Sequence, residues 1–139
     1  PTRAVMVAHA LSPTLGEAVR PASLSETIVG RLHRAATGPI IADDLEMGAL
    51  VGHGFLGERA AAALRAGCDQ VLVCNALGER AAVAAHVEAW AARDPGLAAA
   101  LRDGAARVAG FGGGPQRLVE WHEVVESVAR ARGLAGEGP

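Results

Sequence analysis

The sequence contains neither lysine nor tyrosine, and only 3% of its 139 residues are aromatic. All 13 basic side chains are therefore arginines, and they are interspersed with 15 acidic side chains to give a formal net charge of -2. The chain has no basic field and no long run of one charge sign, so composition predicts no nucleic-acid partner. A small molecule is the expected partner.

Cysteines and long apolar stretches are also scarce. Cys68 and Cys74, the two cysteines, are too few for a scaffold of disulfides, and they flank a strand-like run that suits small apolar side chains. A reducing compartment is therefore expected. No stretch is long enough to span a bilayer, and no charged-then-apolar leader precedes the first apolar run, so no membrane partner is expected.

Half of the residues are hydrophobic, which is enough for the core of one modest domain. Three short runs of small or apolar residues, each ending in a polar one, cover residues 3–9, 39–43 and 69–75. Continuous apolar runs are typical of parallel strands that are covered on both faces. Their spacing of roughly thirty-odd residues suits β-α-β units.

Helical patterns fill the remaining sequence. Between the strands, Ser25 is the expected N-cap of a helix over 26–36, and Gly67 is expected to end a helix over 54–66. Three further helices are predicted over 78–92, 95–109 and 115–132. The chain thus divides into β-α units over 1–77 and C-terminal helices over 78–139, which are expected to pack on the same domain.

Three strands are too few for a closed parallel barrel, which takes eight strands and about 250 residues. Three parallel strands alone would also leave two unpaired edges. The sequence therefore leaves three possibilities open: upstream sequence completes the sheet, a second chain does so, or the fold is not a barrel.

The second apolar run ends in two adjacent carboxylates, Asp43 and Asp44. A buried strand that delivers acids to its C-terminal tip is a common way for parallel α/β enzymes to place catalytic groups. The alternative for each aspartate is a turn or N-cap role. A third hypothesis is that the pair holds Mg²⁺ for phosphoryl transfer, although alternation along a strand would direct the two side chains to opposite faces unless the strand bends.

Four segments, in order, resemble the C-terminal half of family 3 glycoside hydrolases of the β-N-acetylhexosaminidase type: residues 5–9, 21–25, 40–49 and 63–75. The resemblance implies an α/β fold that is the C-terminal part of a (β/α)8 TIM barrel, about three parallel strands with helices, followed by C-terminal helices. It also implies hydrolysis of terminal β-linked N-acetylglucosamine from muropeptides or related glycans, with retention of configuration. No metal or organic cofactor is implied, and the implied role is cytoplasmic cell-wall recycling.

The same resemblance assigns the site residues. Asp43 corresponds to the nucleophile, because the first aspartate of the pair has that role in the family. Asp44 is expected to bond neighbouring backbone or to orient the site. Met47 is expected to line the sugar pocket, with core packing as the alternative because methionine commonly fills gaps. His9, at the end of the first strand, is the remaining candidate for substrate binding, with a hydrogen-bonded core histidine as the alternative.

The chain also departs from the family pattern. Ala42 replaces the serine or threonine that precedes the nucleophile in the family. The family carries a Lys-His and Gly-His-Gly segment and an Asp-His acid/base loop upstream of the first strand seen here, and this sequence does not include those upstream motifs; its Gly52-His53-Gly54 lies after the aspartate pair. A retaining mechanism needs a proton donor, so the isolated chain is expected to be impaired or inactive without the N-terminal half of the barrel, on the same or a separate chain. The alternative is a non-catalytic half-barrel remnant that binds sugar or a partner protein.

Overall fold

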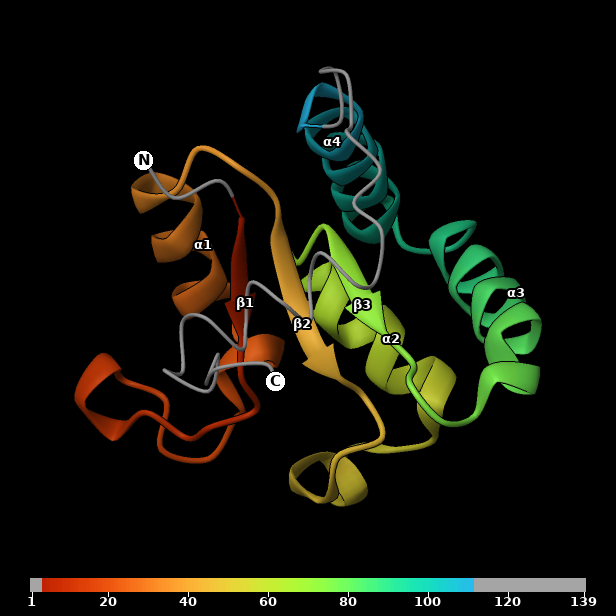
Figure 1. The fold of residues 1–139 in the computed structure, drawn as a ribbon, viewed down its shortest axis with the longest axis horizontal. Helices are drawn as coiled ribbons and strands as arrows, with labels where there is room; N and C mark the ends of the chain where they lie inside the picture. The colour runs from red at the N-terminus through yellow and green to blue at the C-terminus, as the bar shows by residue number, and fades with distance from the viewer. Residues whose placement is uncertain (1–3, 112–139) are drawn as a thin grey trace, which may run out of the picture.

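The computed structural model describes residues 4–111 and shows three parallel strands that alternate with helices (Figure 1). One sheet with the order β1-β2-β3 contains the strands β1 (Val5–Val7), β2 (Ile40–Asp44) and β3 (Gln70–Leu72). Both strand pairs are parallel, so each connection must cross back along the sheet. The crossovers are the helices α1 (Glu26–Ala35) and α2 (Leu56–Arg65). The predicted α/β class and the parallel sheet are confirmed.

The predicted boundaries of the crossover helices are confirmed at two of their ends. Ser25 precedes α1, and its hydroxyl accepts a hydrogen bond from the Ile28 amide at 3.2 Å. Gly67 follows α2 with a φ of +107°, a backbone conformation that side chains rarely adopt. The start of α2 was predicted two residues early, because Gly54 has a φ of +91° and Phe55 is the N-cap; a 3-10 helix, η3 (Gly48–His53), precedes them.

The second half of the described chain is helical, as predicted. After a single 3-10 turn, η4 (Leu77–Glu79), come α3 (Arg80–Ala91) and α4 (Pro95–Phe111), which pack on α2 and on each other. These helices confirm the prediction for residues 78–109 to within two residues at each end. The predicted helix over 115–132 lies outside the described residues, and the division of the chain at residue 77 stays a prediction.

The described helices cover one face of the sheet. Val7, Ala42 and Val71 lie side by side across the three strands, and Val7 and Ala42 are buried. Met6, on the opposite face, is 56% exposed. The expectation that the strands are covered on both faces is therefore wrong for the described residues. A run of apolar residues shows that a strand can be buried on both faces. Whether both faces are covered depends on elements that lie far away in sequence.

The core lies between the covered face and the helices. Its fully buried large apolar side chains come from α1, β2, the segment after β2 and α4: Val29, Ile40, Leu45, Leu50 and Leu97. This packing anchors both ends of β2, because Ile40 begins the strand and Leu45 directly follows it. The core packing therefore holds the carboxyl end of β2 in place.

The carboxyl ends of the three strands lie along one edge of the sheet, at the bottom of Figure 1. The loop between β1 and α1 lies along this edge, and it contains the 3-10 turns η1 (Pro13–Leu15) and η2 (Ala22–Leu24). The turn into η3 and the segment after β3 complete the edge. Side chains from segments 30 residues apart or more thus meet there. Within residues 4–111, no helix has both the length and the apolar character that crossing a bilayer requires.

Candidate active site

Strand β2 contains a bulge at its carboxyl end. Ala42 pairs with Val71 and Asp44 pairs with Leu72, so two steps along β2 match one step along β3. Asp43 is the extra residue. A bulge of this kind interrupts the alternation of side chains and turns a side chain in a new direction, and bulges are frequent beside active sites.

The Asp43 carboxylate has one oxygen engaged. Its Oδ1 accepts a hydrogen bond from the Asp44 amide at 2.8 Å. Its Oδ2 has no hydrogen-bond partner among the described residues, and the side chain is half-buried. The strand tip therefore fixes this carboxylate through one oxygen and leaves the other available for chemistry.

Asp44 is engaged on both its side chain and its carbonyl group. Oδ1 accepts from the amides of Glu46 at 3.2 Å and Cys74 at 3.4 Å. The Asp44 carbonyl oxygen accepts from the Met47 amide at 3.1 Å. These contacts match the expected role of Asp44 in bonding neighbouring backbone, whereas its contact with substrate stays a prediction.

His9 is buried, with 6% of its surface exposed, and both ring nitrogens have partners. Nε2 lies 2.9 Å from the Asp44 carbonyl oxygen, and because a carbonyl only accepts, Nε2 is the donor. Nδ1 lies 2.6 Å from the hydroxyl of Ser23, from which a neutral imidazole accepts. This geometry favours the hydrogen-bonded alternative for His9, since a direct contact with sugar would require one of these bonds to break.

Met47 lies just after the turn that follows the aspartate pair. Its side chain is 45% exposed and so is available at the edge of the site. Its predicted role in lining a sugar pocket stays a prediction.

Two polar residues of this edge were not singled out from the sequence. Ser23 is fully buried and holds His9. Glu46 accepts hydrogen bonds from the amides of Asn75 at 2.6 Å and Ala76 at 2.9 Å, one on each carboxylate oxygen. A serine in a Pro-Ala-Ser segment and an acidic residue in a turn carry no local signal of such contacts, because their partners are 14 to 30 residues away.

The two cysteines differ in environment. Cys74 is exposed beside the aspartate pair, and its pKa is raised by desolvation and by the charges of Asp44, Glu46 and Asp43. Burial, with a smaller contribution from Asp69, raises the pKa of the Cys68 thiol to about 12. Cys68 donates to the Ser23 carbonyl oxygen at 3.5 Å, which suits a structural thiol.

The geometry bears on the magnesium hypothesis. The bulge supplies the bend that would let Asp43 and Asp44 act on one side of the strand. Oδ1 of Asp44 is occupied by two amides, however. Among residues 4–111, no three histidine, cysteine, aspartate or glutamate side chains gather as the ligands of one metal ion would.

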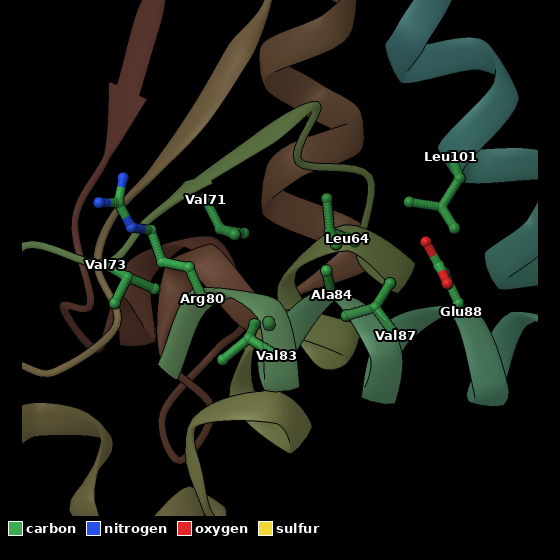
Figure 2. A pocket seen from close by; sticks show the side chains of 10 residues that line it. Leu64, Val71, Val73, Arg80, Val83, Ala84, Val87, Glu88 and Leu101 are labelled. Carbon is green, nitrogen blue, oxygen red and sulfur yellow. The ribbon is translucent and has the colours of Figure 1, made fainter. Parts of the chain in front are cut away.

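A cavity of about 440 Å³ lies along the free edge of β3, away from the aspartate pair. Figure 2 shows Val71 and Val73 on one side of it and Val83, Ala84 and Val87 of α3 on the other. Its lining is largely apolar, with Arg80 and Glu88 as its charged side chains, and it includes neither Asp43 nor Asp44. The carboxyl edge of the sheet therefore remains the candidate site.

The model of the family described as glycosyl hydrolase family 3 N terminal domain matches residues 1–108. The chain belongs to this family. The predicted resemblance is thereby confirmed.

Curated members with similar sequences are named β-hexosaminidase. The protein of Idiomarina loihiensis is 39% identical over 74 residues, which are 51% of this chain and 22% of the relative. The protein of Chromobacterium violaceum is 43% identical over 75 residues, which are 52% of this chain and 20% of the relative. The chain thus spans about a fifth of the length of these curated relatives.

A solved structure agrees with this assignment. The β-N-acetylhexosaminidase from Beutenbergia cavernae superimposes with a TM-score of 0.70 at 33% sequence identity, over 79% of this chain and 33% of that chain. The family 3 chain described here therefore has the fold of part of a (β/α)8 barrel, as predicted, with three of its parallel strands and their helices.

Proposed function

We propose that this family 3 chain carries the nucleophile of a retaining β-N-acetylhexosaminidase, and that Asp43 is that nucleophile. The observation that supports the proposal is the position of Asp43 on a bulge at the carboxyl edge of the sheet, with an Oδ2 that has no hydrogen-bond partner within residues 4–111. Active sites of (β/α)8 barrels lie at this edge. The relatives are named β-hexosaminidase and β-N-acetylhexosaminidase, which supports a β-linked hexosaminide as the substrate class, and the family resemblance implies terminal N-acetylglucosamine.

In the proposed reaction, Oδ2 of Asp43 attacks the anomeric carbon of the sugar. The bond to the leaving oxygen breaks, that oxygen takes a proton from an acid, and a glycosyl ester with Asp43 forms. Water, deprotonated by the same group now acting as a base, then attacks the anomeric carbon and releases Asp43. Two displacements at one carbon give retention of configuration.

The acid/base group is proposed to come from the N-terminal half of the barrel, on the same or a separate chain. The described groups around Asp43 have other partners: His9 bonds Ser23 and Asp44, and the carboxylates of Asp44 and Glu46 accept from backbone amides. Both ring nitrogens of His9 and both carboxylate oxygens of Glu46 are thus engaged, and Oδ1 of Asp44 holds two amides. Muropeptides as substrates, and cytoplasmic recycling of cell-wall glycans as the role, complete the proposal on the basis of the family resemblance.

A chimera tests the nucleophile in a complete barrel. Residues 4–108 of this chain replace the matching segment of the Beutenbergia cavernae enzyme, and hydrolysis of a chromogenic β-N-acetylglucosaminide is measured. We expect activity, and we expect Asp43→Asn to lower kcat by on the order of 10³-fold or more, since it removes the group that forms the ester.

Asp103→Asn is the matched control, because Asp103 is an exposed aspartate on α4. It should leave kcat unchanged. A chimera that keeps its activity after Asp43→Asn would reject the nucleophile assignment. A folded chimera that binds N-acetylglucosamine without hydrolysing the substrate would instead favour the non-catalytic binding remnant.

A further inference from the structure

Glu46 links two segments at the carboxyl edge of the sheet, the turn after β2 and the segment after β3. We propose that Glu46 is a positioning residue, which holds residues 74–76 against the turn that carries the nucleophile and so fixes Asp43. This inference rests on the function proposed above for Asp43. The Glu46 side chain bonds backbone amides of the site, and the proposal gives it no contact with the substrate.

The contact uses the whole carboxylate. Oε2 accepts from the Asn75 amide at 2.6 Å and Oε1 accepts from the Ala76 amide at 2.9 Å. Hydrogen bonds to a charged acceptor are shorter and stronger than neutral ones, and a two-point contact also fixes orientation. A solvated surface glutamate would not place both oxygens on consecutive amides of another segment.

The neighbouring amide belongs to the same arrangement. The Cys74 amide donates to Oδ1 of Asp44 at 3.4 Å. Three consecutive amides after β3 thus point at carboxylates from the segment after Asp43, and consecutive N–H groups of this kind form a concave anion-binding site. In this protein its own Asp44 and Glu46 fill that site.

The turn after β2 is braced on its other sides as well. Arg59 of α2 donates to the carbonyl oxygens of Leu45 at 3.0 Å and Gly54 at 2.7 Å. His9 donates to the carbonyl oxygen of Asp44. Contacts from the segment after β1, from α2 and from the segment after β3 therefore converge on the residues next to Asp43. A nucleophile is sensitive to small displacements, and an error of about 1 Å can cost on the order of 100-fold in rate.

Amide hydrogen exchange on the full 139-residue chain, resolved by residue, tests the contact without requiring activity. In Glu46→Ala we expect the Asn75 and Ala76 amides to exchange about tenfold faster, since both lose a charged acceptor. Glu46→Gln keeps one carbonyl oxygen as an acceptor and should give an intermediate rate. Glu79→Ala, in the nearby η4, is the matched control and should leave both amides unchanged.

Kinetics in the chimera test the consequence for the nucleophile. Glu46→Ala should lower kcat on the order of tenfold with a smaller change in KM, and Glu46→Gln should restore part of the loss. A far-ultraviolet circular dichroism spectrum like that of the parent chimera shows that each variant is folded.

Unchanged exchange in Glu46→Ala overturns the contact, and faster exchange with unchanged kcat overturns the positioning role. If activity instead survives Asp43→Asn, the proposed nucleophile fails, and the exchange rates still decide whether Glu46 holds the segment after β3.

Discussion

Two adjacent aspartates of one strand have different surroundings because of a single bulge. Oδ1 of Asp43 accepts from one amide, that of the next residue, whereas Oδ1 of Asp44 accepts from two, those of Glu46 and of Cys74 in the segment after β3. The same residue type thus serves as a candidate nucleophile at one position and as a support at the next. The difference lies in the register between β2 and β3 and not in the chemistry of the side chain.

The thiol of Cys74 can report on the charge of Asp44. Desolvation and the nearby carboxylates raise the pKa of Cys74, with Asp44 as the largest charged contributor. Asp44→Asn removes the charge and keeps an acceptor oxygen, so the pKa should fall and the thiolate fraction at pH 8 should rise. We expect a few-fold faster reaction of Cys74 with an aromatic disulfide reagent.

Asp103→Asn should leave that rate unchanged, because Asp103 does not contribute to the pKa of Cys74. Cys68, which is buried and has a pKa of about 12, should react only after denaturation. Equal rates for the parent chain and Asp44→Asn would contradict the described contact between residues 44 and 74.

At the scale of elements, the ends of the helices follow local rules, whereas their packing does not. Asp94 precedes the proline that begins α4, and its Oδ1 accepts from the amides of Gly96 at 2.8 Å and Leu97 at 3.1 Å. This is an N-cap with proline at the first helical position. The close approach of α2 to α3 depends on Gly57, where an added Cβ would lie 2.9 Å from the Cβ of His86. The residues around Gly57 do not predict this approach, because His86 lies on another helix.

The N-cap predicts a pH-dependent contribution to stability. The hydrogen bonds that the backbone amides of Leu97 and Gly96 donate, together with the charge of Arg65, hold the pKa of the Asp94 carboxyl below its ordinary value of 3.8. A group with a lowered folded-state pKa contributes its full stability above the unfolded-state value and loses it as pH falls through the folded-state value. Asp94→Ala should therefore lower Tm by roughly 5 °C at pH 7.

Thermal unfolding followed by circular dichroism from pH 7 to pH 2 measures this difference. It should shrink below about pH 4 as the parent carboxylate becomes protonated. Asp103→Ala, in the middle of α4, is the control and should show no such pH dependence. A difference between the parent chain and Asp94→Ala that stays constant down to pH 2 would argue against a charged cap.

At the scale of the whole molecule, the described sheet has one covered face and two free edges. Met6 is exposed on the open face, and the apolar cavity of Figure 2 runs along the free edge of β3. The chain spans about a third of the solved Beutenbergia cavernae enzyme. These features fit the proposal that further barrel segments supply the groups that Asp43 needs.

The isolated chain is therefore expected to have almost no glycosidase activity. On a chromogenic β-N-acetylglucosaminide, its rate should equal that of its Asp43→Asn variant, since His9 and Glu46 beside Asp43 are engaged at both of their polar atoms and the proposed acid belongs to the N-terminal half of the barrel. Hydrolysis above background that Asp43→Asn abolishes would show that the chain needs no partner segment.

The sequence predicted the strands, the start of α1, the end of α2, the family and the aspartate pair. It could do so because apolar periodicity, N-caps and C-terminal glycines act over a few neighbouring residues. It placed His9 at the site but left open whether the ring faces sugar or core. It assigned no role to Glu46 or Ser23, whose partners lie in other segments.

By itself, the sequence determined an α/β chain of family 3 with acids at the tip of its second strand. Only the tertiary structure decided that Asp43 is the bulged residue, that His9 bonds the backbone of Asp44, and that Glu46 holds the segment after β3. The physical reason is one of distance along the chain. Local patterns arise among neighbours, whereas strand register and hydrogen bonds between residues about 30 apart form only once the sheet brings the strand ends together.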